Sequence, residues 1–476
     1  MANEREPLHR RLSTEPRATR AESPEPPVHA VLALQRSAGN SAVARLLGGR
    51  RTLQRKIGFE LEAGEWQSAL LDRPLAMMEQ QSGEVSKQAR TTPPAARKAF
   101  YEQGNIRGTA DELPGTDRDV EFVIKEQDES QAGAIGADFD RVDAAFDEMH
   151  GKLPAKAWMW PEKRLGWSPP DPGVWLLDNP TRDRTVQMQA TAGVRLDKIA
   201  DLMAGLDPSA TAPTNPLDDP RSQTGMHPGA GASLGRSYDI GLNAVVEFVN
   251  KRSQLPALQQ NLVGMIGLIA LMAQMIDGGD APPADQQQAT YAYPKSMAHL
   301  LPRTNFVHLM GRLPGDQQDM LRAADPIDTA QPALVSLIQE LCDQAGLGDI
   351  DTPVLGWSKW KQIEEGMIVP DLTRRAWAEG IVAGQDRLSE SGYLAWLESR
   401  KDTLDTTTYE KRKKESKQLD SLGAWKDKMD TRGNERLPLV EFRALVLGNL
   451  NRDMTITQAK DVGLRLAAYI DRIASS

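Results

Sequence analysis

Cysteine is almost absent from this chain of 476 residues, which contains only Cys342. A single cysteine excludes a disulfide framework and a zinc site built from cysteines. Cys342 itself lies in an apolar helical pattern, which indicates an inert packing role. Histidine is also scarce, and its six copies show no metal-ligand spacing such as H-x-x-x-H: His9, His29, His150, His227, His299 and His308.

Long apolar segments are missing as well. The first 20 residues contain no apolar stretch of the kind that marks a secretory signal peptide, so we expect no signal peptide. The longest apolar run, 262–276, is interrupted by glycines and is shorter than the roughly 20 residues of a bilayer span. It predicts a buried helix and no membrane span.

Neither a G-x-x-x-x-G-K-S/T phosphate loop nor a dinucleotide-binding fingerprint occurs in the sequence.

The net charge of −9 conceals two regions of opposite sign. Residues 1–56 contain 11 lysines and arginines against 5 glutamates, a charge of +6, and the remainder contains 46 against 61 acids, a charge of −15. An acidic body argues against a general nucleic-acid-binding protein.

Residues 1–27 are charged and rich in proline, so they cannot bury enough surface to offset the entropy of ordering, and we expect them to be disordered.

A short helical hairpin is predicted at residues 28–49, where Gly39 and Asn40 separate two apolar stripes. Within it, LQRSAGNSAVARLL (residues 34–47) resembles a signature of proteins associated with extracellular contractile injection systems. The resemblance implies cargo that is cytoplasmic in the producing cell, is exported with the particle, and is loaded through residues 28–49. The alternative is a hairpin that packs on its own domain. We therefore predict a basic leader at 1–53 and a second domain at 54–476.

Four segments of the second domain alternate between apolar and polar side chains with the period of two that is typical of β-strands: 53–64, 117–126, 184–194 and 437–445. Each predicts a half-buried strand with one apolar and one polar face. The polar faces carry, in chain order, Glu60 and Glu62, Glu121, Gln187 and Gln189, and Glu441 with Arg443.

Helices are predicted between these strands, so the fold class is α+β, with an antiparallel, curved sheet surrounded by helices. Their expected ranges are 138–150, 196–206, 244–276 with a division at Pro256, 314–324, 332–345, 372–381 and 457–473. Helical insertions are expected at about 207–300 and 388–430. The second insertion contains a lysine-rich run, 411–417, which indicates a solvated face or a contact with an acidic partner.

Glu60 and Glu62 are the first candidate site residues, because they lie on one face of a strand, roughly 6.6 Å apart along the backbone. Two carboxylates this close repel each other unless a cation lies between them. Mg²⁺ takes oxygen ligands and keeps several waters, so an open carboxylate face suits it. The alternative is an ordinary solvent-exposed face.

This arrangement, with Arg303 in a loop and a closing Glu-x-Arg strand, resembles the carboxylate–amine ligase superfamily, which includes glutamine synthetase, glutamate–cysteine ligase and the amidoligases. The resemblance implies a glutamine synthetase-like domain over about 54–476 that binds ATP and Mg²⁺. It also implies roles for single residues: Glu60, Glu62, Glu121 and Glu441 as metal ligands, Arg443 at the transferred phosphoryl group, Arg303 at phosphate or the substrate carboxylate, and Gln187 or Gln189 where many members place a cofactor-site histidine.

One departure from the superfamily is the missing histidine after the third strand. The glycine-rich stretch 224–235, around His227, is similar to a glutamine synthetase segment, yet Pro228 and the glycines favour a loop. The tryptophan-rich stretch 158–167 suits either a substrate-capping flap or core packing.

The sequence therefore predicts an ATP- and Mg²⁺-dependent ligase that joins a small-molecule or protein carboxylate to an amine through an acyl phosphate, carried as an effector or toxin of an injection system. Such phosphoryl transfer needs charge neutralisation and alignment, and no serine or cysteine nucleophile. The alternatives are a non-catalytic effector or structural protein with a degenerate ligase fold, and a metal-dependent hydrolase that uses the same carboxylates.

Overall fold

The computed structural model divides the chain into two compact units, Met1–Thr52 and Leu53–Ser476. The residues that it describes are 56–70, 98–110, 119–128, 130–152, 158–159, 161, 165–171, 174–178, 185–252, 259–276, 300–352, 372–415, 429–430, 437–443, 445 and 453–475. The expected disordered leader and its hairpin at 28–49 lie outside the described residues.

A ten-stranded sheet is the centre of the second unit. Its strands are β1 (Lys56–Leu70), β2 (Ala99–Gln103), β3 (Ile106–Ala110), β4 (Asp119–Asp128), β5 (Trp158–Met159), β6 (Val174–Asp178), β7 (Gln187–Gly193), β8 (Leu300–Pro302), β9 (Met429–Asp430) and β10 (Leu437–Phe442). All four predicted strands are present, as β1, β4, β7 and β10. The last two residues of the expected helical insertion form strand β9 instead.

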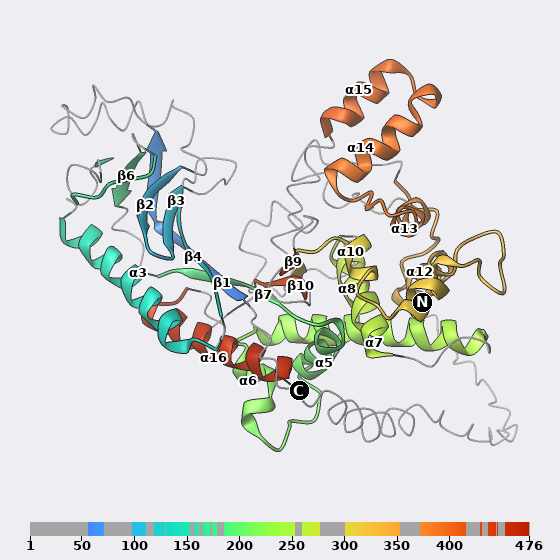
Figure 1. Ribbon diagram of the computed structural model, residues 1–476, viewed down its shortest axis with the longest axis horizontal. Helices are drawn as coiled ribbons and strands as arrows, with labels where there is room; N and C mark the ends of the chain where they lie inside the picture. The colour runs from blue at the N-terminus through green and yellow to red at the C-terminus, as the bar shows by residue number, and fades with distance from the viewer. Residues whose placement is uncertain are drawn as a thin grey trace, which may run out of the picture. The chain divides into compact units, whose positions relative to one another are not determined.

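The strands are antiparallel and follow the order β2-β3-β4-β1-β7-β10-β8, with β5 paired to β6, β6 to β1, and β9 to β10. Among the described strands β2 and β8 end this path without pairing to each other, so the sheet stays open. The predicted α+β class with an antiparallel sheet surrounded by helices is confirmed (Figure 1).

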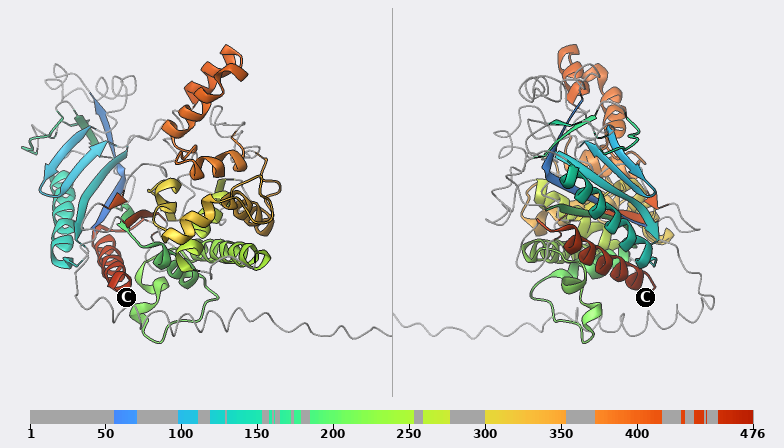
Figure 2. Two further views of the ribbon diagram at one scale, coloured as in Figure 1. Left: turned by 45° about the vertical axis from the view of Figure 1, so that its right-hand side comes forward. Right: turned by 90° about the vertical axis from the view of Figure 1, so that its left-hand side faces the viewer.

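Two helices cover the apolar face of β4, β1 and β7, namely α3 (Ala132–Lys152) and α16 (Ile456–Ser475) (Figure 2). The Phe59 ring of β1 packs edge-on against Phe139 of α3, with 5.1 Å between the ring centroids. Gly463 of α16 lies over both rings, because a Cβ atom there would come within 2.9 Å of Phe139 and 3.1 Å of Phe59. The alternating apolar residues of the strands therefore supply half of a two-layer core.

The other helices follow β7 in the chain: α5 (Leu196–Leu206), α6 (Pro220–Gln223), α7 (Pro228–Lys251), α8 (Gln260–Ile276), α10 (Phe306–Met310), α11 (Gly315–Arg322), α12 (Ala333–Ala345), α13 (Arg374–Val382), α14 (Glu390–Ser399) and α15 (Thr406–Glu415), with the 3₁₀ turns Pro216–Asp218 and Lys401–Thr403. The predicted ranges agree closely at α5 and α12. Residues 253–258, which contain Pro256, lie between α7 and α8 and outside the described residues.

The expectation of a loop at 224–235 was wrong, because α7 begins at Pro228. Proline suits the first helical position, where its missing N–H would have no partner. The glycines serve close packing: a Cβ atom on Gly231 would come within 2.4 Å of the Leu206 carbonyl oxygen of α5. Gly264 of α8 lies still closer to the backbone of α5, because a Cβ atom there would come within 2.0 Å of the Leu196 carbonyl oxygen. The glycines thus let α5, α7 and α8 approach each other.

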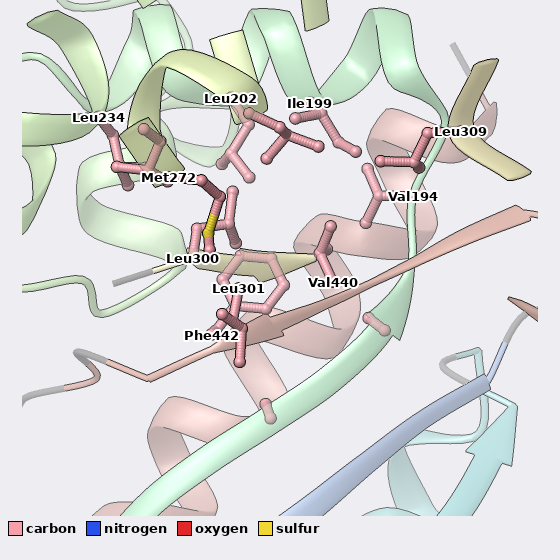
Figure 3. Close-up of a cluster of buried hydrophobic side chains, with 14 of the residues drawn as sticks. Val194, Ile199, Leu202, Leu234, Met272, Leu300, Leu301, Leu309, Val440 and Phe442 are labelled. Carbon is pink, nitrogen blue, oxygen red and sulfur yellow. The ribbon is translucent and has the colours of Figure 1, made fainter. Parts of the chain in front are cut away.

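Leucine-rich packing joins this helical layer to the β10 and β8 end of the sheet (Figure 3). Val440 and Phe442 of β10 lie beside Leu300 and Leu301 of β8, and α5 contributes Leu202. The apolar run of α8 is buried in this core, as predicted, and so is Cys342 of α12. No helix in the described part of the chain is long and apolar enough to cross a membrane.

A buried ion pair ties the end of α7 to the turn after α11. Arg252 donates from Nε to Asp325 Oδ1 at 2.6 Å and from Nη2 to Oδ2 at 2.5 Å. Burial alone would raise the pKa of the Asp325 carboxyl, but hydrogen bonds from Arg252, the Ser336 hydroxyl and the Ile327 N–H outweigh it and lower the pKa to about 2. The pair therefore stabilises the fold only while Asp325 is ionised.

We expect this contribution, up to about 2 kcal/mol, to be complete above a pH of about 5 and to be lost as the pH falls through about 4 towards 2. The measurement is urea unfolding of the wild type and Asp325→Asn across this range. The stability difference between the two proteins should shrink as the pH falls. A difference that stays constant with pH would contradict the assignment.

Candidate functional site

The register of the central strands places the predicted acids and amides on one face of the sheet. Glu62 of β1 lies directly opposite Glu121 of β4 on one side and Gln187 of β7 on the other. Glu60 lies opposite Gln189 of β7. Directly opposed residues of antiparallel strands project to the same face. The five side chains therefore form one polar patch, which we call the acid–amide patch.

Hydrogen bonds organise the acid–amide patch. Gln189, which is 5% exposed, donates from Nε2 to Glu62 Oε1 at 2.5 Å. Gln187 donates from Nε2 to Asp453 Oδ1 at 3.0 Å. A bridge between Val186 and Met454 brings Asp453 there. Sequence reasoning missed Asp453, because nothing local in the chain indicates that its segment returns to β7.

A second group is built around Glu441 of β10, whose side chain is completely buried. Arg443 donates from Nη1 to Glu441 Oε1 at 2.7 Å. Arg303 forms an ion pair from Nε to Glu441 Oε2. We call these three residues the Arg–Glu–Arg triad.

The backbone explains why Arg303 meets Glu441. Arg303 follows β8 directly, and its N–H donates to the Leu439 carbonyl of β10 at 2.8 Å. In the ladder between the two strands, Leu301 lies opposite Glu441, and Arg303 is two residues further on and so returns to the same face. The register thus aims Arg303 along the face that carries Glu441.

The triad has a net charge of +1, because one carboxylate faces two guanidinium groups. The side chains of Arg303 and Arg443 are 23% and 13% exposed. Guanidinium groups that are partly desolvated and held by a fixed carboxylate bind oxyanions such as phosphate or carboxylate. The triad therefore suits an anion with one or two negative charges.

Along β7, Gln189 is the member of the acid–amide patch that lies nearest in sequence to Thr191, the partner of Glu441. Glu441 pairs with Thr191 of β7, and the last pair of this ladder is Phe442 with Ala190. The ladder ends there, and Arg443 follows directly after the end of β10. By strand spacing, the Cα atoms of Glu60 and Glu441 are about 12 Å apart, and those of Glu62 and Glu441 roughly 16 Å. The sheet thus brings both groups onto one face but keeps them on neighbouring parts of it.

The fit of a metal ion to these residues is partial. No group of three or more His, Cys, Asp or Glu side chains in the described segments lies close enough to hold an ion. Glu441 is engaged by two arginines. Mg²⁺, however, is usually held by one or two carboxylates together with waters and substrate phosphates, and Glu60, Glu62 and Glu121 offer that oxygen chemistry. Metal binding by the four glutamates stays a prediction.

Two other residues singled out by sequence have structural roles. His227, which is buried, caps α7, since its Nδ1 accepts a hydrogen bond from the Gly229 N–H at 3.0 Å. Trp167 packs on Tyr101, with 4.6 Å between ring centroids, and donates from Nε1 to Glu148 at 3.0 Å. The packing interpretation therefore holds for Trp167, while Trp160 lies outside the described residues.

Comparison with known proteins assigns no family. No family profile matches this chain, and neither does any curated protein. A solved structure of a Vibrio cholerae toxin from the MARTX/VgrG family aligns with 83% of this chain and 94% of its own, at 11% identity and a TM-score of 0.32. A likeness of this size supports no assignment of fold or function.

Proposed function

We propose that this protein is an ATP- and Mg²⁺-dependent carboxylate–amine ligase with a glutamine synthetase-like domain. The observation that supports the proposal best is the Arg–Glu–Arg triad beside the acid–amide patch on one face of an antiparallel sheet. A reaction that moves a phosphoryl group onto a carboxylate needs positive charge beside the phosphoryl group and beside the carboxylate. It also needs oxygen ligands for the metal ion close to them. The two groups supply both kinds of side chain.

In this proposal each residue of the two groups has a defined role. Arg443 contacts the phosphoryl group during transfer, and Arg303 holds a phosphate or the substrate carboxylate. Glu441, for which the resemblance implies metal binding, keeps both guanidinium groups in place instead. One or two of the carboxylates of Glu60, Glu62 and Glu121 would hold Mg²⁺ together with waters and phosphate oxygens, and the bound ion would neutralise phosphate charge. Gln189 fixes Glu62, and Gln187 and Gln189 line the nucleotide site.

The reaction has two steps. The substrate carboxylate attacks the γ-phosphorus of ATP, and ADP leaves, so an acyl phosphate forms. The amine nitrogen then attacks the acyl carbon, phosphate departs with the bonding electron pair, and the nitrogen loses a proton. The test is incubation with labelled ATP, Mg²⁺ and a panel of amino acids, with amine-dependent phosphate release as readout. No release with any carboxylate and amine pair would contradict the ligase proposal.

A second candidate is a non-catalytic effector with a degenerate ligase fold. It is favoured by the separation of Glu62 from Glu441 along the sheet and by the engagement of Glu441 with two arginines. The two candidates differ in one measurement. A non-catalytic effector would release no phosphate from ATP under any condition, even where it binds the nucleotide.

Glu62→Gln is expected to weaken binding of Mg²⁺ or Mn²⁺ at least tenfold, about 1.4 kcal/mol. The substitution removes a negative charge beside Glu121 and keeps the shape of the side chain. Isothermal titration checks the result, with Glu398→Gln, a surface acid paired with Lys401, as the control. Equal metal affinity in Glu62→Gln and the wild type would remove Glu62 from the metal site.

We further propose that the protein is an effector or toxin loaded into a contractile injection particle through residues 28–49. The resemblance at residues 34–47 supports this. Deleting residues 1–50 should leave the melting temperature and any ligase activity nearly unchanged and should abolish packaging. A large fall in melting temperature would mean that the leader belongs to the core. Intact packaging would mean that the segment recognised for loading lies elsewhere in the chain.

A further inference from the structure

The backbone around Arg303 is anchored on both sides by groups that do not belong to the triad. Toward β10, Thr304 Oγ1 accepts a hydrogen bond from the Leu439 N–H at 2.8 Å, and the Thr304 side chain is completely buried. The Arg303 N–H donates to the carbonyl of the same Leu439. Two consecutive residues are therefore fixed to one residue of β10, two positions before Glu441.

The second anchor is Asp386, in the turn between α13 and α14, which is 4% exposed. Its Oδ2 accepts from the Phe306 N–H at 2.8 Å. Its Oδ1 accepts from Trp377 Nε1 at 3.1 Å and from the Leu388 N–H at 3.1 Å. A buried carboxylate with three N–H donors is costly to disturb, so it holds the Phe306 backbone firmly.

Packing strengthens the second anchor. The Phe306 and Trp377 rings meet edge-on, with 5.3 Å between centroids and 89° between planes. Ser389, which caps α14, donates from Oγ to the Asp386 carbonyl at 2.6 Å. Asp386 thus connects the start of the α14 and α15 insertion to the segment that begins at Arg303.

Only Thr304 and Asn305 separate Arg303 from Phe306, so this short segment is pinned at both ends. A long arginine side chain loses much rotamer freedom when it forms an ion pair. Because the backbone of Arg303 is already fixed, less conformational entropy is lost when the side chain pairs with Glu441. We propose that Thr304 and Asp386 are positioning residues that hold Arg303 against Glu441 and so prepare the anion site. The catalytic meaning of this role depends on the proposed function, but the positioning itself does not.

The experiment follows the Arg303 guanidinium directly. Protein labelled with nitrogen-15 arginine gives an Nε–H signal for Arg303, assigned by its loss in Arg303→Lys. The hydrogen-exchange rate of this signal is compared in the wild type, Thr304→Val, Thr304→Ser and Asp386→Asn, and inorganic phosphate affinity is measured by titration. Asp325→Asn is the matched control, because it alters an equally buried carboxylate in the ion pair with Arg252.

Thr304→Val and Asp386→Asn should each speed exchange at the Arg303 Nε–H at least tenfold and weaken phosphate binding. Thr304→Ser, which keeps the acceptor, should behave like the wild type. Asp325→Asn should lower the melting temperature without changing the Arg303 signal. If Asp386→Asn does not fold, the comparison of Thr304→Val with Thr304→Ser tests the positioning role by itself.

An unchanged exchange rate of the Arg303 Nε–H in Thr304→Val would overturn the inference. Equally fast exchange in Asp325→Asn would also overturn it, because it would show that any loss of stability speeds exchange at this group. Accelerated exchange in a protein that binds neither phosphate nor ATP would support the positioning role and contradict the proposed function. The two failures are therefore distinguishable.

Discussion

Glu441→Gln is expected to lower the free energy of unfolding by about 3 kcal/mol. The substitution keeps the size of the side chain and removes the only charge that the triad places between Arg303 and Arg443. Two partly desolvated guanidinium groups would then face a neutral amide in place of the carboxylate that pairs with both of them. Urea unfolding at neutral pH and moderate salt measures the difference.

Glu340→Gln is the matched control for this prediction. Glu340, in helix α12, is buried like Glu441, but its partner Lys251 is half exposed, with 2.7 Å between Lys251 Nζ and Glu340 Oε2. Because water solvates that lysine after the change, we expect a loss of only about 1 kcal/mol. Equal losses in the two variants would show that the second arginine adds nothing to the role of Glu441.

Arg443→Lys is expected to leave the fold intact and to lower ATP turnover about 100-fold, or roughly 3 kcal/mol of transition-state stabilisation. Lysine keeps the positive charge, but its point-like ammonium group cannot face Glu441 and a phosphoryl oxygen with the fork of donors that arginine has. Phosphate release with the best carboxylate and amine pair is the measurement.

Arg375→Lys is the control, since Arg375 pairs with Asp351 on the surface, with 2.7 Å between Nε and Oδ1. It should keep full turnover, because exposed ion pairs contribute little. Full turnover in Arg443→Lys as well would mean that Arg443 is only an ion-pair partner of Glu441. Both variants should melt within a few degrees of the wild type.

Periodicity in the sequence was sufficient to find the four strands that carry the candidate site. In β1 the residues Ile57, Phe59 and Leu61 are buried, while Glu60 and Glu62 are half-buried. A strand with one face on a core must alternate in this way, so its polar residues share a face whatever the rest of the fold does. The same argument holds for β4, β7 and β10.

The β2–β3 hairpin was missed, although the chain contains a signal for it. Gly104 and Asn105 form a two-residue connection between strands, and Gly104 has φ +60°. A Gly-Asn pair between two short alternating runs is typical of such a hairpin, since glycine accepts a positive φ without strain. The start of α7 was missed because its glycines were interpreted as a sign of a loop. In the structure these glycines let α7 pack closely against its neighbouring helices.

The sequence by itself determined which side chains share a face: the glutamates of β1, the glutamines of β7 and the Glu-x-Arg of β10. Only the tertiary structure decided which strands are neighbours. The order β4-β1-β7-β10-β8 puts Glu121 and Gln187 on either side of Glu62 and brings Arg303 to Glu441 across more than a hundred residues of chain. The physical reason is that alternation depends on each strand alone, whereas strand order depends on hydrogen bonding and packing between distant segments, which no local pattern encodes.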